Sequence, residues 1–194
     1  MTDRIRRDQG IPAAMVRSYK QPLYDSELIR TAAPGADLLL FQKPIGQFLS
    51  DGSTVKSAIH TNMQSAGQLG ASLSFDLFGF NVRVPKGITT SDFNSIYTNA
   101  LFEYKMDSDL LFLQVPLEEL PCGVDTDGVG QTDAYHNGVG TVDNYYRFDL
   151  GGKGLHINTT ENFQVKVSFP TTDPTITANR LLRAYLRGIY YRGI

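Results

Sequence analysis

The amino-acid sequence predicts an all-β fold, an antiparallel sandwich of about eight strands with one or two short inserted helices. Turn-forming residues are frequent, because the 194 residues include 18 glycines and 9 prolines. Several segments alternate apolar and polar residues with the period of two that is typical of strands with one buried face. No such segment is followed by the amphipathic helix of about 10 to 15 residues that a parallel crossover needs.

The chain is expected to begin with a flexible basic arm, residues 1–22, followed by a single domain over residues 23–194. The arm shows no sustained apolar periodicity and ends at Gln21-Pro22. With 41% hydrophobic and 20% charged residues, the rest of the chain can bury one compact core.

A short helix is predicted at the start of the domain. Asp25 or Ser26 can cap it, and Pro34-Gly35 ends it after Ala33. The apolar run over residues 38–41 then predicts a short buried strand, and residues 54–61 predict a weaker one.

Residues 72–84 carry the strongest alternation in the chain. The apolar positions slip by one residue between Leu77 and Phe78. Because such a slip moves the apolar side chains to the other face, a continuous strand needs a bulge here, and Gly79 is placed to allow one.

The middle of the chain predicts a helix, a hairpin and a series of short strands. Residues 89–100 offer a cap followed by apolar residues at helical spacing. The remaining predicted elements are a hairpin of residues 102–106 and 109–115, strands over 145–150, 155–158 and 163–169, and a loop over 171–178.

The last segment fits either a strand or a helix. As a strand, Leu182, Ala184 and Leu186 face one side, with Arg183, Tyr185 and Arg187 on the other. As a helix, it would place Leu182, Tyr185, Leu186 and Ile189 on one stripe. The cluster of aromatic and β-branched residues near the end favours the strand.

Residues 121–143 contain an internal repeat and are predicted to form an exposed loop that projects from one end of the domain. The motif Gly-Val-Gly-x-x-Asp-x-Tyr occurs twice, ten residues apart, each time after a tight-turn signal. The residues expected at the surface are Asp125, Asp127, Gly128, Asp133, Gly138 and Asp143. The spacing fails the EF-hand pattern at two positions, which leaves open an irregular calcium site that includes Asp133.

No residue pattern of an enzyme or of a metal or cofactor site occurs. His60, His136 and His156 are far apart and lie outside metal-binding motifs, and Cys122 lacks a nucleophile's context. Neither a G-x-S-x-G elbow nor a phosphate-binding glycine motif is present. We therefore expect no catalysis, no cofactor and no small-molecule substrate.

The sequence also predicts where the chain is made. It has no apolar run near the roughly 18 residues of a membrane span and no apolar stretch of a secretory signal at its start. A single cysteine excludes an intramolecular disulfide. Synthesis in a cytoplasm is expected.

Charge is distributed unevenly along the chain. Residues 1–20 have a net charge of +3, residues 180–194 have +4, and the segment between them has −9. One interpretation is a surface that meets a polyanion, either a genome or lipid headgroups, through Arg4, Arg6, Arg7, Arg183 and Arg187. The other is that the spaced arginines only solvate a terminal element.

Tyrosines near the C-terminus predict a contact surface. Alternation is expected to place Tyr185, Tyr190 and Tyr191 away from the core, where they would serve interfaces between subunits. Self-assembly into a homo-oligomer follows from this interpretation.

The order of elements resembles that of the single jelly-roll capsid proteins of tailless icosahedral viruses and phages. The resemblance is carried by residues 155–158, the alternating strand 161–169 and the closing Leu181-Leu-Arg-Ala-Tyr-Leu-Arg-Gly188, and spans residues 38–192. It implies an antiparallel eight-stranded jelly roll that self-assembles into an icosahedral shell without catalysis, its basic arm turned inward. It also implies location in the virion after synthesis in the host cytoplasm.

Two other classes remain open from the sequence. A carbohydrate-binding or receptor-binding jelly roll would use aromatic platforms such as Tyr135, Tyr145 and Tyr146, although Trp is absent. A hydrolase on a sandwich scaffold would use paired carboxylates, such as Glu118-Glu119 or Asp107 and Asp109, whose separation in space a sequence does not give.

Overall fold

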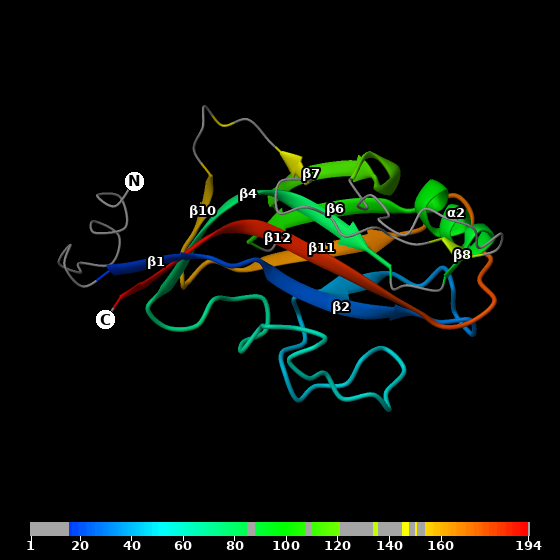
Figure 1. Ribbon diagram of the computed structural model, residues 1–194, viewed down its shortest axis with the longest axis horizontal. Coiled ribbons are helices and arrows are strands. Elements are labelled where there is room, and N and C mark those ends of the chain that lie inside the picture. The colour runs from blue at the N-terminus through cyan, green and yellow to red at the C-terminus, as the bar shows by residue number, and fades with distance from the viewer. Residues whose placement is uncertain are drawn as a thin grey trace.

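The computed structural model describes residues 16–84, 88–107, 110–120, 134–135, 145–147, 150 and 154–193. These residues form two antiparallel β-sheets that pack face to face, so the predicted all-β sandwich is confirmed. Figure 1 shows the long strand β12 running through the molecule, with β1 at one end and helix α2 at the other.

The first sheet is organised around β12 (Arg180–Gly193). On one side β12 pairs with β2 (Leu23–Ile29) and, further along, with β1 (Val16–Lys20). On the other side it pairs with β4 (Leu73–Arg83) over almost its whole length. The opposite edge of β4 carries β9 (Tyr146–Arg147) and β10 (Leu155–Ile157).

The second sheet has the order β3, β11, β6, β7. Its strands are β3 (Leu38–Leu40), β11 (Phe163–Ser168), β6 (Leu101–Met106) and β7 (Leu110–Pro116). Helix α2 (Thr90–Asn99) and the 3-10 turn η2 (Leu117–Glu119) lie at one end, beside the small pair β5 (Ile88–Thr89) and β8 (Ala134–Tyr135).

The core lies between the two sheets and is built from their alternate residues. Phe80 of the first sheet packs against Phe102 and Tyr104 of the second, with ring centroids 5.3 and 5.0 Å apart. Leu182, Ala184 and Leu186 point into the same core, which confirms the C-terminal segment as a strand rather than a helix.

The predicted bulge in β4 is also confirmed. Arg187 pairs with Gly79 and Gly188 pairs with Leu77, so Phe78 has no partner on β12. This extra residue keeps Phe75, Leu77, Phe80 and Val82 buried on one face despite the slip in the sequence pattern.

The predictions over the middle of the chain are mostly confirmed. Thr89 caps α2 by accepting a hydrogen bond from the Asp92 backbone amide at 3.1 Å. The hairpin of β6 and β7, the strands β3, β10 and β11, and the loop before β12 lie where the sequence predicts them. The strand expected over residues 145–150 is described only as the short β9.

Three predictions near the N-terminus need correction. The helix expected from Asp25 or Ser26 is wrong, because these residues belong to β2. The strand expected over residues 54–61 is also wrong, since residues 41–72 form a long irregular segment with one isolated bridge, Phe48 to Val55. The last residues of the expected arm form β1, and residues 1–15 lie outside the described part of the chain.

The reason for the failed helix is tertiary. Asp25 and Glu27 resemble a cap and a first-turn acid, but both point inward from β2 and are buried. Their charges pair with that of Lys56, which is distant in sequence.

Within the described residues, no helix is long and apolar enough to cross a membrane.

Candidate polyanion-binding face

The outward face of the first sheet gathers arginine and tyrosine side chains. In β12 the outward positions alternate with the buried Leu182, Ala184 and Leu186 and hold Arg183, Tyr185 and Arg187. Register places Tyr24 of β2 opposite Tyr185 and Arg83 of β4 opposite Arg183. We call Tyr24, Arg83, Arg183, Tyr185 and Arg187 the arginine–tyrosine face.

Aromatic rings, rather than carboxylates, accompany the cations of this face. The Tyr185 ring has the Arg187 guanidinium at 4.9 Å from its centroid and the Arg83 guanidinium at 5.6 Å. The Arg183 guanidinium lies 5.9 Å from the Tyr24 ring centroid. Such cation–π contacts orient guanidinium groups without neutralising their charge.

Neutral oxygens complete the contacts of these arginines. Arg183 donates from Nε to Ser26 Oγ at 2.8 Å and from Nη2 to the Ile59 carbonyl at 2.7 Å. Arg83 donates from Nε to Asn81 Oδ1 at 3.3 Å. Among the described residues, none of the three arginines forms an ion pair with a carboxylate.

The sheet register holds like charges together. Arg83 and Arg183 are directly opposite each other on adjacent strands, an arrangement that destabilises a sheet. Burial, and then the nearby charge of Arg83, lower the pKa of Arg187 below the ordinary value. These neighbouring like charges lower the stability of the sheet, and such a local loss of stability is typical of binding surfaces.

Arg180, at the start of β12, has a structural role instead of a binding role. Arg180 donates to Asp92 Oδ2 from Nε at 2.9 Å and from Nη2 at 2.6 Å. Thr177 donates to the same carboxylate from its amide and its hydroxyl. This ion pair holds the start of β12 against α2. The charge of Arg180 is balanced by Asp92 and is not available to a ligand.

The predicted polyanion residues fall into two groups. Arg183 and Arg187 share the outward face, where the strand interpretation places them. Arg4, Arg6 and Arg7 lie outside the described residues. Sequence reasoning missed Arg83, although it stands at an outward position of the alternating segment 72–84, and missed Tyr24 because β2 was predicted as a helix.

The predicted exposure of the interface tyrosines is wrong for two of the three. Tyr190 is 6% exposed; it stacks on Tyr19 and meets Phe75 edge to face, with ring centroids at 5.3 and 4.9 Å. Tyr191 is 4% exposed and donates its hydroxyl to Asp76 Oδ2 at 3.1 Å. Tyr185 is half-buried within the arginine–tyrosine face.

The residues predicted for the exposed repeat loop lie outside the described part of the chain: Asp125, Asp127, Gly128, Asp133, Gly138 and Asp143. Where the chain is described, no group of three or more histidine, cysteine, aspartate or glutamate side chains could hold a metal ion. The calcium site that the sequence left open with Asp133 likewise lies outside the described residues.

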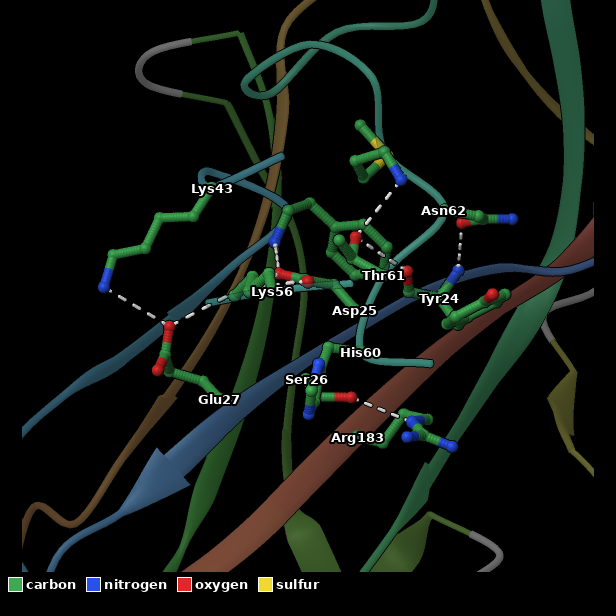
Figure 2. A network of polar contacts seen from close by, with 12 residues as sticks. Tyr24, Asp25, Ser26, Glu27, Lys43, Lys56, His60, Thr61, Asn62 and Arg183 are labelled. Carbon is green, nitrogen blue, oxygen red and sulfur yellow. Dashed lines mark hydrogen bonds and ion pairs between the residues drawn. The ribbon is translucent and has the colours of Figure 1, made fainter. Parts of the chain in front are cut away.

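A buried polar cluster lies on the inner side of β2, shown in Figure 2. Lys56 Nζ donates to the two Asp25 carboxylate oxygens at 2.8 and 2.9 Å and lies 3.6 Å from Glu27. Lys43 approaches Glu27 from the surface at 3.4 Å. Ser26, between the two acids, points the other way toward Arg183. Because each buried charge has an opposite partner, the cluster fixes the irregular segment 41–72 against the sheet.

A second polar cluster joins β4, β10 and β12. His156 Nδ1 lies 2.6 Å from Asp76 Oδ1, and Nε2 lies 3.0 Å from Asn158 Oδ1. Both ring nitrogens thus face oxygen atoms of the protein. The cluster ties three strands together and leaves neither nitrogen open to a metal ion.

No protein family model, no curated protein and no solved structure matches the chain.

Proposed function

We propose that the chain is a single jelly-roll subunit that self-assembles into an icosahedral shell of a virus or phage, with the arginine–tyrosine face turned toward an enclosed polyanion. The observation that carries the proposal is that face, on which arginines are held together without a carboxylate among the described residues. A surface of this kind attracts polyanions by releasing their counterions.

The strand order supports a jelly roll. When β1 and β2 are counted as the first strand and β9 and β10 as the sixth, the sheets have the orders 1-8-3-6 and 2-7-4-5. Strand 1 pairs with 8, 2 with 7, 3 with 6 and 4 with 5, all antiparallel. The same pairing is expected of a long hairpin rolled into two Greek keys, which is the jelly-roll arrangement.

Exposed apolar residues support self-assembly. Strand β7 is the last strand of the second sheet, and its Leu110 and Leu111 are 61% and 44% exposed. Phe48 and Ile59, in the irregular segment 41–72, are 49% and 72% exposed. A sheet edge with exposed leucines is prone to pair with another chain, so we assign β7 to a contact between subunits.

The proposal is tested with the purified full-length chain. We expect closed particles by negative-stain microscopy and size-exclusion chromatography. Leu111→Lys should reduce assembly because it puts a charge on the β7 edge, whereas Lys105→Gln, on the outer side of the adjacent strand β6, should assemble normally. A chain that stays monomeric over a wide range of concentration and salt would overturn the proposal.

The polyanion is tested separately from assembly. The double variant Arg183→Gln/Arg187→Gln should form particles that retain less nucleic acid, with the deficit shrinking as salt is raised, because the variant releases fewer counterions. Unchanged nucleic-acid content in intact particles would contradict the assignment of this face.

A further inference from the structure

The buried polar cluster on the inner side of β2 holds an amine and a carboxyl group in contact, away from water (Figure 2). Lys56 Nζ lies 2.8 Å from Asp25 Oδ1 and 2.9 Å from Asp25 Oδ2, and both side chains are fully buried. Because Nζ is almost equally far from the two oxygens, it also lies close to Cγ, the carbon atom that they share. A nucleophile and an electrophile held in this way react as parts of one molecule, without having to meet by diffusion.

Burial makes the charged forms of this pair costly. Desolvation raises the pKa of Asp25 above its ordinary value of 3.8, although the charge of Lys56 and the hydrogen bonds from Lys56 and the Phe41 amide act in the opposite direction. Transfer of one proton from the ammonium group to the carboxylate converts the ion pair into a neutral amine and a carboxylic acid. These neutral forms are the ones that condense to an amide.

Two further groups are placed to assist an attack of the nitrogen on the carbon. The Phe41 amide donates a hydrogen bond to Asp25 Oδ2 at 2.6 Å, where negative charge develops when Cγ is attacked. Glu27 Oε2 lies 3.6 Å from Lys56 Nζ, is buried, and makes no hydrogen bond within the described structure. The Ser50 amide donates to the other oxygen, Oε1, at 2.5 Å and so orients the carboxylate. A carboxylate in this position can take a proton from the amine.

We propose that Lys56 and Asp25 join in an intramolecular isopeptide bond, a covalent amide between two side chains, which the folded chain forms without the help of an enzyme. The proposal goes beyond the function proposed above and does not depend on it. The bond ties β2 to the irregular segment 41–72 and closes a loop between positions 31 residues apart. Like a disulfide, such a link restricts the unfolded chain and stabilises the fold.

The step is a condensation that releases one water molecule. The Lys56 amine attacks Asp25 Cγ, and the electron pair of the C–Oδ2 double bond moves to Oδ2, which the Phe41 amide stabilises. Glu27 takes one proton from the nitrogen and passes it to the Oδ1 hydroxyl, which leaves as water when the double bond to Oδ2 forms again. One C–N bond forms, one C–O bond breaks, and Glu27 returns to its starting state. No oxidation or reduction takes place.

A second lysine–aspartate pair is a control within the same molecule. Lys166 Nζ lies 2.7 Å from Asp37 Oδ2, which is as close as the contact in the buried pair. These two side chains are 29% and 50% exposed, so water solvates both charges and favours the ion pair over the neutral forms. We expect no bond between Lys166 and Asp37.

The test is the intact mass and the tryptic map of the purified, denatured chain. The mass should be lower than that of the sequence by one water molecule. Trypsin does not cleave at a linked Lys56 or before Pro44, so residues 21–30 and 31–83 should appear together as one branched peptide. Cleavage after Lys166 should be normal.

Loss of water has a second chemical source that the map must separate. Aspartates that precede glycine lose water by closing to a cyclic imide, and this sequence has two of them, Asp51-Gly52 and Asp127-Gly128. Fragmentation of the branched peptide should place the loss at Lys56 and Asp25. A loss that maps to Asp51 or Asp127 instead would overturn the proposal.

Variants test the assigned roles in samples taken at increasing times after synthesis. Glu27→Gln keeps the size of the side chain but removes the proton acceptor, so it should slow formation of the bond about a hundredfold. Lys56→Arg keeps the buried positive charge for folding, and should retain the full mass because a guanidinium group does not attack. Lys43→Gln removes only the surface cation near Glu27 and is the control that should form the bond.

The outcomes distinguish this proposal from the shell. Full mass in the folded unaltered chain, with trypsin cleavage after Lys56, would overturn the isopeptide bond and leave an ion pair. Loss of water that persists in Lys56→Arg would also overturn it, and an unchanged rate in Glu27→Gln would overturn the path assigned to the proton. A chain that carries the bond yet stays monomeric would support this proposal and overturn the shell.

Discussion

The arginines of β12 occupy two contrasting environments. At the start of the strand, Arg180 meets the buried carboxylate of Asp92, and Thr177 completes the acid's hydrogen bonds. In the middle, Arg187 lies over the ring of Tyr185 and close to a second arginine, Arg83. The same residue type is therefore paired with a carboxylate at one position and held without one seven residues further along the strand.

These two environments indicate which arginines contribute to folding stability and which are available to bind a ligand. An arginine that pairs with a buried acid is needed for folding, because its removal leaves an uncompensated charge. An arginine held by rings and neutral oxygens is not needed in this way, and its charge remains available to a ligand. On the outer side of the second sheet the cation is paired as well, since Lys166 is opposite Glu103 and lies 2.7 Å from Asp37, but this pair is partly exposed and contributes less to stability.

The largest effect is expected at the paired charges in the interior. Lys56→Met should lower the free energy of unfolding by about 3 to 5 kcal/mol, because Asp25 and Glu27 would stay buried without their common partner. Urea denaturation measures the loss. Lys43→Met removes only the more exposed contact to Glu27 and should cost less than about 1 kcal/mol. Similar losses for the two variants would contradict the ranking.

A smaller loss is expected at the paired end of β12. Arg180→Gln should cost about 2 to 3 kcal/mol, less than Lys56→Met because the Arg180 side chain is partly exposed. Burial alone raises the pKa of Asp92, but the hydrogen bonds from Arg180 and Thr177 outweigh it and hold the pKa below its ordinary value of 3.8.

The sign of the pH dependence follows from that lowered pKa. The ion pair contributes its stability above 3.8, the ordinary pKa of the acid, and loses it as the pH falls through the lower value of the folded state. The gap in unfolding free energy between the unaltered chain and Arg180→Gln should therefore be widest at neutral pH and narrow in acid. A gap that does not change with pH would show that Arg180 acts through packing alone.

Local pattern in the sequence predicts the parts of the fold that depend on neighbouring residues. The slip at Leu77 and Phe78 predicts the bulge, and the alternation of Leu182, Ala184 and Leu186 predicts which face of β12 is buried. The helix predicted at Asp25 fails because the partner of that acid, Lys56, is 31 residues away in the sequence.

The candidate site was predictable only in part, for the same reason. Arg183 and Arg187 share a strand face by spacing alone, whereas Arg83 joins them through a register that no local pattern encodes. Alternation along the last segment predicts Tyr190 outside the core, and this prediction is wrong. Its burial against Phe75 and Tyr19 depends on pairing between the two ends of the described chain.

An intermediate effect is expected where a glycine makes room for the rings of the outer face. Gly79→Ala should cost about 1 to 3 kcal/mol, because the added Cβ would stand 1.9 Å from the Tyr146 carbonyl oxygen and force β9 away from β4. Tyr145 and Arg147, whose ring and guanidinium lie together, would move with β9. Gly70→Ala, whose Cβ would meet only the end of the Leu73 side chain at 3.4 Å, is the control for the loss of a glycine without a backbone clash. A loss in Gly79→Ala no larger than in Gly70→Ala would show that the close approach of β9 to Gly79 does not limit the side chain at this position.

The smallest effect on stability, with the opposite sign, is expected among the unpaired arginines. Arg83→Gln removes one of two like charges that are directly opposite each other, so it should raise the free energy of unfolding by about 0.5 kcal/mol while weakening polyanion binding. Lys166→Gln is the matched control on the other sheet, where the opposite strand holds Glu103, and it should lower the free energy of unfolding by a similar amount. Urea denaturation measures the change in unfolding free energy of each variant. Both changes, the gain for Arg83→Gln and the loss for Lys166→Gln, should be smaller in high salt than in low salt, because salt screens the charges. If Arg83→Gln were destabilising by as much as Arg180→Gln, the arginines of the outer face would be structural like Arg180, and the contrast between the two environments of β12 would fail.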